Sequence, residues 1–281
     1  MTQLPTLKIE NEKKGITTGP RACTTMLHHN AANRTPIVRT RINARASLAE
    51  AQERRPAHRR RRKNNFSPTG QVRGIEEASA KSNRTLKKGD IYLVDSGGQY
   101  SFGTTDVTRT VSLDNKSKFI KEIYTRVLKG HIAVSNYKVR SNTKGSDIDR
   151  NARKYLKKIG LDYPHGTGHG VGYFLNVHEG PQSFSKKNKI NLKSGMIISN
   201  EPGYYKEGYF GIRIENLIFI KKNKFEELTL VPMDKDLIKK KMLNKNEVAW
   251  LNEYHAKVKR NLFKFMNLEE KVNLIEACSP I

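Results

Sequence analysis

The chain has 281 residues, of which 36% are hydrophobic and 28% charged, and a formal net charge of +26 at pH 7. This length and apolar content allow one large domain or two small ones with a buried core. No apolar run reaches the roughly 18 residues of a membrane helix, and no charged head with an apolar run resembles a signal peptide. The two cysteines, Cys23 and Cys278, lie too far apart in sequence to suggest a ligand pair, so we expect a cytoplasmic protein.

Arginine is concentrated in one early segment. Residues 33–79 hold eleven of the twenty arginines but one lysine, whereas lysine exceeds arginine by 32 to 9 elsewhere. Turn formers and few large apolar residues predict an inserted, disordered loop here. Its basic run at residues 59–63 permits a second interpretation, RNA or DNA binding through phosphate contacts. The remaining positive charge indicates no more than weak nonspecific adhesion, so we expect no specific nucleic-acid binding.

The segment DIYLVDSGGQYSFGTTDVTRTVSL, residues 90–113, predicts a β-hairpin. Two apolar strands flank SGGQYSFGTT, which is rich in turn formers and predicts the connection. Asp95, at the end of the first strand, is then expected near Asp106, early in the second. Two carboxylates in a partly buried site repel each other, so one must bind a proton or both must bind a cation.

Two amphipathic helices are predicted next. Apolar residues recur at helical spacing in residues 115–137. Residues 147–159 predict a second helix, and Gly160 is a suitable stop at its C-terminal end.

The segment HGTGHGVGYFLNVHEGP, residues 165–181, combines three histidines with glycines. Imidazoles can bind divalent metal or carry protons near neutral pH, and glycine lets the backbone approach a ligand closely. The apolar residues at 171–177 are expected to anchor the segment in the core. Taken alone, the segment also fits a glycine-rich loop with incidental histidines.

Residues 195–220, GMIISNEPGYYKEGYFGIRIENLIFI, repeat the acidic design. We predict two apolar strands joined by a Pro-Gly-Tyr-Tyr turn, with Glu201 at one strand end and Glu215 on the other strand. Each carboxylate alone fits a solvated strand end, but two acidic hairpins flanking a histidine segment indicate a shared site. Four carboxylates and an imidazole suit two divalent ions such as manganese, with zinc or cobalt as alternatives, and metal-assisted hydrolysis.

Residues 246–266 are predicted to form the final helix. Its apolar residues, Val248, Trp250, Leu251, Tyr254, Val258, Leu262 and Phe265, are expected to face the core or a partner surface.

The five residues Asp95, Asp106, His169, Glu201 and Glu215, in this order, resemble the dimetal site of the M24 "pita-bread" peptidases. The motifs DSGGQYSFGTTDVTRT, HGTGHGVGYFLNVHEGP and EPGYYKEGYFGIRIEN are similar to those of the Xaa-Pro aminopeptidases (aminopeptidase P), particularly the long cytosolic type. The methionine aminopeptidase and prolidase branches share the five residues but fit their surroundings less well.

The resemblance implies an α+β pita-bread fold, in which helices back a curved antiparallel sheet. The domains expected are a partial N-terminal segment (residues 1–32), the inserted loop (33–79), a dimetal core (80–232) and a helical extension (233–281) that forms a homodimer contact. Long members of the family carry further domains ahead of the catalytic one, so we expect a truncated chain whose fold is incomplete at its N-terminal end.

The resemblance also implies residue roles. Asp95 chelates one metal ion, His169 and Glu201 the other, and Asp106 and Glu215 bridge the two. Glu201 acts in addition as general base toward a water molecule.

Further residues are assigned to substrate by the resemblance. His178 binds near the scissile bond and stabilises the oxyanion or passes a proton, His165 lines the substrate pocket, and Arg213 orients the acidic ligands. His28 is a candidate for a further pocket histidine of the family. The implied substrates are peptides with proline in second position. The alternative is a catalytically inactive remnant, or a binding protein, on the same fold.

Overall fold

The structure is a computed structural model and describes residues 67–68, 85–100, 103–173 and 176–281. His28, the predicted N-terminal segment and nearly all of the arginine-rich loop, including its basic run at 59–63, lie outside the described residues.

The predicted hairpin is present, but its strands are longer than expected. Strands β2 (Ile91–Tyr100) and β3 (Gly103–Ser112) are antiparallel and pair along their whole length, and β1 (Ser67–Pro68) adds to the free edge of β2. The prediction of a connection over residues 96–105 is therefore wrong. Gly97 is needed inside the strand because a Cβ there would lie 2.8 Å from the Thr105 carbonyl oxygen.

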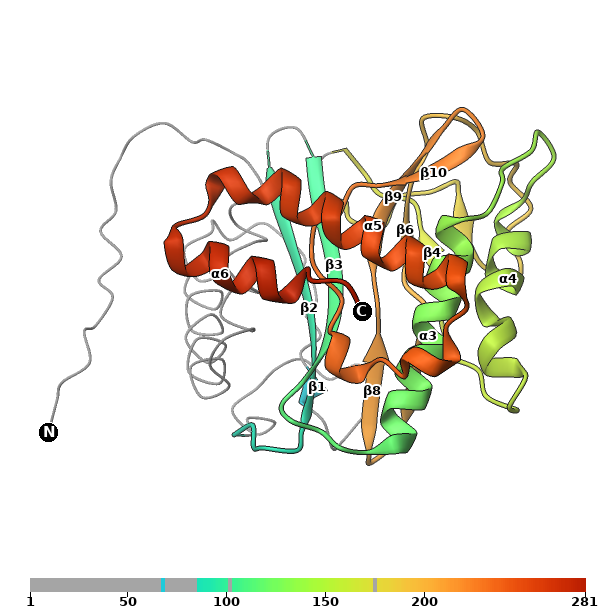
Figure 1. The fold of residues 1–281 in the computed structure, drawn as a ribbon. Helices are drawn as coiled ribbons and strands as arrows, with labels where there is room; N and C mark the ends of the chain where they lie inside the picture. Colours follow the sequence, from blue (N-terminus) through green and yellow to red (C-terminus); the bar gives the residue numbers. More distant parts are fainter. Residues whose placement is uncertain (1–66, 69–84, 101–102, 174–175) are drawn as a thin grey trace, which may run out of the picture.

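Both predicted helices are confirmed with small shifts of their ends. Helix α3 spans Lys118–Ser135 and begins at Ser117, whose side chain accepts a hydrogen bond from the Ile120 N–H. Helix α4 spans Gly145–Lys157. The two helices lie side by side at one end of the molecule (Figure 1).

Short antiparallel strands fill the middle of the chain. They are β4 (Gly168–His169), β5 (Ser183–Phe184), β6 (Ile197–Asn200), β7 (Gly203–Lys206), β8 (Phe210–Arg213), β9 (Asn216–Lys221) and β10 (Lys224–Glu227). They pair as β10-β9-β6, β4-β5 and β7-β8. The predicted Pro-Gly-Tyr-Tyr turn is wrong, because residues 203–206 pair with β8 and the turn follows at residues 207–209.

The C-terminal part is helical. It contains three short 3-10 helices, η3 (Lys235–Leu237), η4 (Lys240–Met242) and η5 (Phe263–Phe265), and two α-helices, α5 (Lys245–Leu262) and α6 (Leu268–Ala277). The predicted helix matches α5 and η5 but is not the last one. Leu251, Tyr254, Val258 and Leu262 of its apolar stripe are buried as expected, whereas Phe265 is 44% exposed.

Of three apolar clusters among the described residues, one lies on β2 and β3 and two join the helices to the strands. In the larger one, α3 and α5 pack against the buried side of β8 through residues such as Leu128, Ile212 and Val258. In the other, α3 and α4 pack against β6, β9 and β10. Figure 1 shows α5 crossing the strands, with α6 folded back beside it. The α+β class is thus confirmed, although the described strands form several small sheets. No helix in the described part of the chain is long and apolar enough to cross a membrane.

One buried histidine predicts how stability depends on pH. His255 of α5 accepts a hydrogen bond at Nε2 from the Met233 N–H at 3.0 Å. Burial, together with the charges of Lys235 and Arg109, lowers its pKa from 6.5 to about 3. Below about pH 6.5 the unfolded chain therefore binds a proton at His255, whereas the folded chain binds it only near pH 3. The free energy of unfolding decreases as the pH falls from about 6.5 toward 3.

We expect His255→Gln to reduce this acid sensitivity, because the Gln side-chain oxygen can accept the same hydrogen bond without titrating. The loss in free energy of unfolding between about pH 7.5 and 4.5 should shrink by roughly 2 kcal/mol. Urea unfolding at both pH values measures it. An unchanged loss would show that other groups control the acid response.

Candidate metal centre

Six of the sequence-predicted residues converge at one place. Three overlapping groups have ligand atoms that all lie within 4.8 Å of one another. The groups are Asp95, Asp106 and Glu215; His169, Glu201 and Glu215; and Asp106, His169 and His178. Asp106, His169 and Glu215 each belong to two groups, and the two carboxylates among them are buried. The carboxylates of Asp106 and Glu215 thus lie between the imidazoles on one side and the Asp95 carboxylate on the other.

The hairpin brings the two aspartates together through its register. Asp95 lies opposite Thr108, and Asp106 lies opposite Gly97. Directly opposed residues of antiparallel strands project to the same face, and side chains two positions apart in a strand also share a face. Asp95 and Asp106 are therefore diagonal neighbours on one face, with no side chain at Gly97 between them.

The two glutamates are placed by a second pair of strands. Asn200 of β6 pairs with Asn216 of β9, at one end of their ladder. Glu201 follows Asn200 directly and Glu215 precedes Asn216, so the two carboxylates lie just beyond the last pair. The Glu215 N–H donates to the Thr108 carbonyl at 3.0 Å, which joins this end of the ladder to β3.

His169 presents a single nitrogen to the carboxylates. Its Nδ1 donates to the Gly170 carbonyl at 3.0 Å, since a carbonyl can only accept. Its Nε2 lies 3.4 Å from both Asp106 Oδ2 and Glu201 Oε1. A backbone bond at one ring nitrogen is the usual arrangement for a histidine that ligates metal through the other. Gly168 permits this position, because a Cβ there would lie 1.8 Å from the Ser199 carbonyl oxygen.

Arg213 and Thr108 tie the acidic residues to one another. The Arg213 guanidinium contacts Asp95 Oδ2 at 2.5 Å and Thr108 Oγ1 at 2.9 Å. Thr108 Oγ1 donates in turn to Glu215 Oε2 at 2.6 Å. Arg213 therefore reaches Asp95 directly and Glu215 through one hydroxyl, which agrees with the orienting role expected for it.

The electrostatics of the cluster favour a cation. Burial and the neighbouring carboxylates raise the pKa of Asp95 to about 6, although the Arg213 charge opposes this. Burial and the charges of Asp106 and Glu201 hold the pKa of Glu215 well above its usual range. Burial lowers the pKa of His169, but its contacts with Asp106 and Glu201 more than offset this, so the pKa is raised. Burial is the largest cause of the rise at Asp95 and Glu215, and the neighbouring negative charge contributes to all three shifts. Bound cations would neutralise that charge.

His165 lies outside the three groups, and both of its ring nitrogens are hydrogen-bonded to protein groups. Arg213 Nη1 donates to the Tyr205 hydroxyl at 3.0 Å, which leaves the Tyr205 hydrogen for His165 Nε2 at 2.8 Å. His165 Nδ1 donates to the Gly166 carbonyl at 2.8 Å. Burial lowers the His165 pKa, consistent with a neutral ring. His178 differs, because it is exposed and its ring lies edge-on to His169 with centroids 4.1 Å apart.

The histidine segment is anchored by a buried ion pair. Arg153 of α4 binds Asp149 at 2.9 Å and donates to the His165 carbonyl. Asp149 accepts from the Thr167 hydroxyl at 2.8 Å, and the Thr167 carbonyl accepts from the Glu201 N–H at 2.8 Å. The expected anchoring through residues 171–177 is contradicted at Tyr173, which is 69% exposed.

Arg109 supports Glu215 from the opposite side. It is 1% exposed, and its Nη1 donates to the carbonyls of Thr108 at 2.9 Å and Glu215 at 2.5 Å. Its other nitrogens donate to the Pro232 and Val231 carbonyls, the Asn216 side chain and the Tyr254 hydroxyl. One guanidinium thus joins β3, the start of β9, the segment after β10 and helix α5.

These supporting residues were missed in the sequence, although some signals were present. Thr108 lies two positions after Asp106 and so shares its face of the strand. Asp149 and Arg153 are four apart on the apolar side of a predicted helix, where an unpaired charge would be costly. Tyr205 carried no such signal, because its segment was predicted to be a turn.

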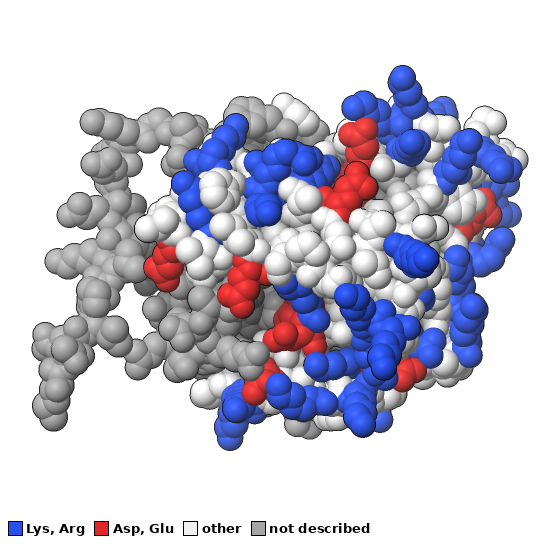
Figure 2. Space-filling view, in the orientation of Figure 1, with Lys and Arg blue, Asp and Glu red and all other residues white. Residues whose placement is uncertain are grey.

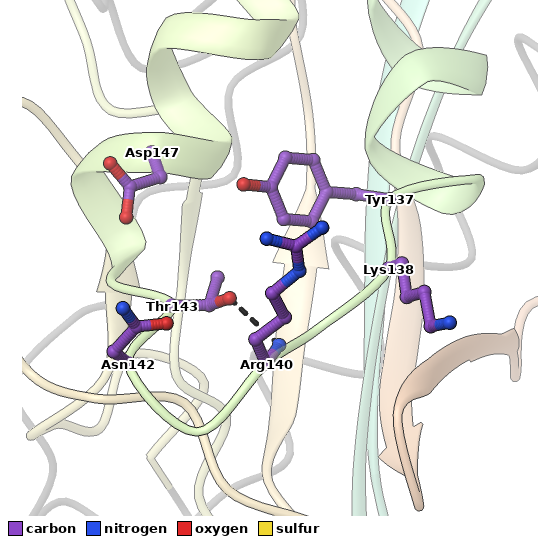
Figure 3. Close-up of a pocket in the computed structure, with 6 residues that line it drawn as sticks. All are labelled: Tyr137, Lys138, Arg140, Asn142, Thr143 and Asp147. Carbon is purple, nitrogen blue, oxygen red and sulfur yellow. Dashed lines mark hydrogen bonds between the residues drawn. The ribbon is translucent and has the colours of Figure 1, made fainter.

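The residues present fit a pair of divalent metal ions. Four carboxylates and one imidazole nitrogen form a hard to borderline donor set with no thiolate, which suits manganese, zinc or cobalt. The raised carboxyl pKa values support the same conclusion. So does the hydrogen bond from His169 Nδ1 to the Gly170 carbonyl, which leaves Nε2 to ligate a metal ion. Asp95, Asp106, His169, Glu201 and Glu215 would hold the ions. The hollow on the α3–α4 loop, drawn in Figure 3, contains none of these residues.

Comparisons with known proteins point the same way. Metallopeptidase family M24 matches residues 16–222, and the C-terminal region of peptidase M24 matches residues 222–281. The chain is 47% identical to Xaa-Pro aminopeptidase 1 of Dictyostelium discoideum in an alignment of 202 residues, and the match covers 67% of this chain and 32% of that protein. It is 50% identical to aminopeptidase P2 of Arabidopsis thaliana in an alignment of 182 residues, and the match covers 60% of this chain and 26% of that one.

A solved structure shares the fold. The X-prolyl aminopeptidase of Caenorhabditis elegans, described as a cytosolic enzyme with a di-nuclear active site, matches with a TM-score of 0.72 and 37% identity. The match covers 77% of this chain and 38% of that one, so this chain spans between 26% and 38% of the three relatives. The expected pita-bread fold is supported by this likeness. The chain belongs to metallopeptidase family M24 and is similar to the Xaa-Pro aminopeptidases of that family.

Proposed function

We propose that the chain is a dinuclear metal-dependent aminopeptidase that removes the first residue from peptides with proline in second position. The observation that carries this proposal is the convergence of Asp95, Asp106, His169, Glu201 and Glu215 on one site. The similarity to Xaa-Pro aminopeptidases supports the substrate class. When bound, two divalent ions supply an acidified water molecule and polarise the scissile carbonyl.

Glu201 has the position of a general base. Its Oε1 accepts from the Ser199 hydroxyl at 2.8 Å and faces His169 Nε2 at 3.4 Å, so the carboxylate is held beside His169 within the cluster. It can accept the proton of an attacking water molecule.

The two remaining histidines differ in what they can do. His178 is exposed beside His169, so its ring can meet a peptide and donate a hydrogen bond to a developing oxyanion. His165 has both ring nitrogens occupied by protein groups. We therefore assign His165 to the wall of the pocket and not to proton transfer.

Location and assembly complete the proposal. We propose a cytosolic location, which the description of the Caenorhabditis elegans relative supports. A homodimer through residues 233–281 stays a prediction. The alternative function is that of a catalytically inactive protein, or a binding protein, on the same fold.

The test of function is release of the first amino acid from an Xaa-Pro-Pro tripeptide and from the matched Xaa-Ala-Pro tripeptide. The proposal expects manganese-dependent release from the first peptide, and at least about tenfold slower release from the second, since the pocket would recognise the proline ring. Equal rates on both peptides would argue against Xaa-Pro specificity while leaving a metallo-aminopeptidase in place.

Thr108→Val tests whether the site is a built metal centre. The change keeps the side-chain shape but leaves Arg213 Nε and Glu215 Oε2 without their shared hydroxyl. We expect manganese affinity to fall about 10- to 100-fold, as measured by isothermal titration calorimetry. Thr110→Val is the matched control, because the Thr110 hydroxyl bonds only the Arg213 backbone among the described residues. Equal affinities in the two variants would contradict the proposed centre.

A further inference from the structure

Three loops far apart in the sequence meet at one end of the molecule. They are residues 137–144, between α3 and α4; residues 186–195, before β6; and residues 221–224, the β9–β10 turn. The Val139 N–H donates to the Asn223 carbonyl at 2.9 Å, and the Leu192 N–H donates to the Thr143 carbonyl at 2.8 Å. We name this surface the basic loop cluster.

The charge of the cluster is one-sided. Its ten exposed cations are Lys138, Arg140, Lys144, Lys186, Lys187, Lys189, Lys193, Lys221, Lys222 and Lys224. The three loops contain no aspartate or glutamate. Acidic partners from outside reach only Lys186, through Asp162 at 3.4 Å, and Lys221, through Glu226 at 3.2 Å, among the described residues. Figure 2 shows blue side chains gathered over the end of the molecule that carries β9, β10 and α4.

The β9–β10 turn carries charge that folding does not favour. Lys224 lies directly opposite Lys221 in the ladder, and like charges in opposed positions destabilise a strand pair. Lys222 has φ of 57°, in the left-handed region where glycine or asparagine folds more easily. A turn that places lysine at unfavourable positions suggests that the charge serves binding rather than folding.

A hollow lies within the cluster. It has a volume of about 470 Å³ and is lined by Tyr137, Lys138, Arg140, Asn142, Thr143 and Asp147. In Figure 3 the Tyr137 ring and the Arg140 guanidinium face this hollow. Asp147 brings a carboxylate to the wall, but its Oδ2 accepts from the Lys144 N–H at 3.0 Å and its Oδ1 lies 3.8 Å from Arg150. The hollow thus offers an aromatic face, an amide and two cations.

We propose that the basic loop cluster binds single-stranded nucleic acid, without sequence preference, through its phosphates. Cations that follow a backbone, with an aromatic ring that can stack on a base, are the usual elements of such sites. A membrane surface fits less well, because firm attachment takes inserted apolar side chains in addition to basic charge, and Ile190 is the large apolar residue that these loops expose. The cluster holds none of the metal-centre residues, so this binding is independent of the proposed hydrolysis.

The test uses the full chain and a fluorescein-labelled oligouridine of about 20 nucleotides, with fluorescence anisotropy read between roughly 50 and 300 mM KCl. The probe variant combines Lys138→Glu, Lys187→Glu and Lys224→Glu, one cation from each loop. The matched control combines Lys240→Glu, Lys241→Glu and Lys245→Glu, which removes the same charge from exposed positions outside the cluster. Thermal melting confirms that both variants are folded.

We expect the cluster variant to lose at least about tenfold in affinity, and its slope of log Kd against log salt to become shallower by about 2, while the control stays within about threefold. Ultraviolet crosslinks should map to peptides from residues 137–144, 186–195 and 221–224. Equal losses in both variants, or crosslinks confined to residues 33–79, would overturn the proposal. Tighter cluster-dependent binding to phosphatidylserine vesicles than to oligouridine would also overturn it, in favour of a membrane surface.

Discussion

Replacing Asp106 with asparagine is expected to abolish metal-dependent hydrolysis and to lower the bound manganese below two ions per chain. Asp106 belongs to two of the three converging groups, and its Oδ2 lies 3.4 Å from His169 Nε2. Asparagine keeps the shape of the side chain but carries no charge. Loss of a ligand shared by two ions should lower kcat/KM by at least about a thousandfold.

Glu207→Gln is the matched control for Asp106→Asn. Glu207 is exposed in the β7–β8 turn and belongs to none of the converging groups. We expect it to retain metal content, determined by inductively coupled plasma mass spectrometry, and activity within about twofold. If Asp106→Asn kept both bound ions and its activity, the assignment of Asp106 to the centre would be wrong.

Arg109→Met is expected to have the largest effect on stability. The guanidinium is buried, and its hydrogen bonds join four segments of the chain. Methionine fills similar volume but leaves the carbonyls of Pro232 and Glu215 without this donor. An unsatisfied buried acceptor costs about 1–3 kcal/mol, so the total loss should be on the order of 4 kcal/mol, or roughly 8–16 °C in Tm.

One further variant separates charge from geometry at this position, and a second, at Arg126, is the control. Arg109→Lys keeps the charge but not the planar fork, and should still lose about 2 kcal/mol or more. Arg126→Met removes a partly buried arginine that binds Glu122 and the Tyr155 carbonyl, and should lose about 1 kcal/mol. Chemical unfolding measures all three. A loss below about 1 kcal/mol in Arg109→Met would show that the network contributes little.

The helices whose apolar residues recur with a clear helical period were predicted well from the sequence. Helices α3 and α5 were found because their apolar residues recur at helical spacing and bury against a core. Helix α6 was missed because its apolar residues Leu268, Val272 and Ile275 are exposed, so it presents no long buried stripe. Its Asn267 and Glu270 form a capping box, which was the local signal available.

The two turn errors have a common cause. Glycine, serine and proline are frequent in turns, so SGGQYSFGTT and Pro-Gly-Tyr-Tyr were taken as connections. In the structure the small residues admit a close neighbouring strand, as at Gly97 beside Thr105. Composition alone does not separate a tight turn from a strand that needs small residues for packing.

The sequence predicted the residues of the candidate site more completely than the fold around them. The order and spacing of the five metal-centre residues, read through a family resemblance, brought together side chains that the structure also brings together. Their supports depend on contacts between distant segments, as in the bond from Arg109 to the Glu215 carbonyl. Strand alternation places Arg109 on the face of β3 opposite to that of Thr108. No local sequence pattern identifies the partners of Arg109.

The central claim is that this chain hydrolyses Xaa-Pro bonds with two bound metal ions. The measurement that tests it most directly is release of the first amino acid from an Xaa-Pro-Pro peptide by the full chain with manganese, with Glu201→Gln alongside. We expect turnover in the unmodified chain, and at least about a thousandfold less in a Glu201→Gln variant that still folds and binds metal. A folded, metal-loaded chain without turnover would contradict the claim and support the catalytically inactive alternative.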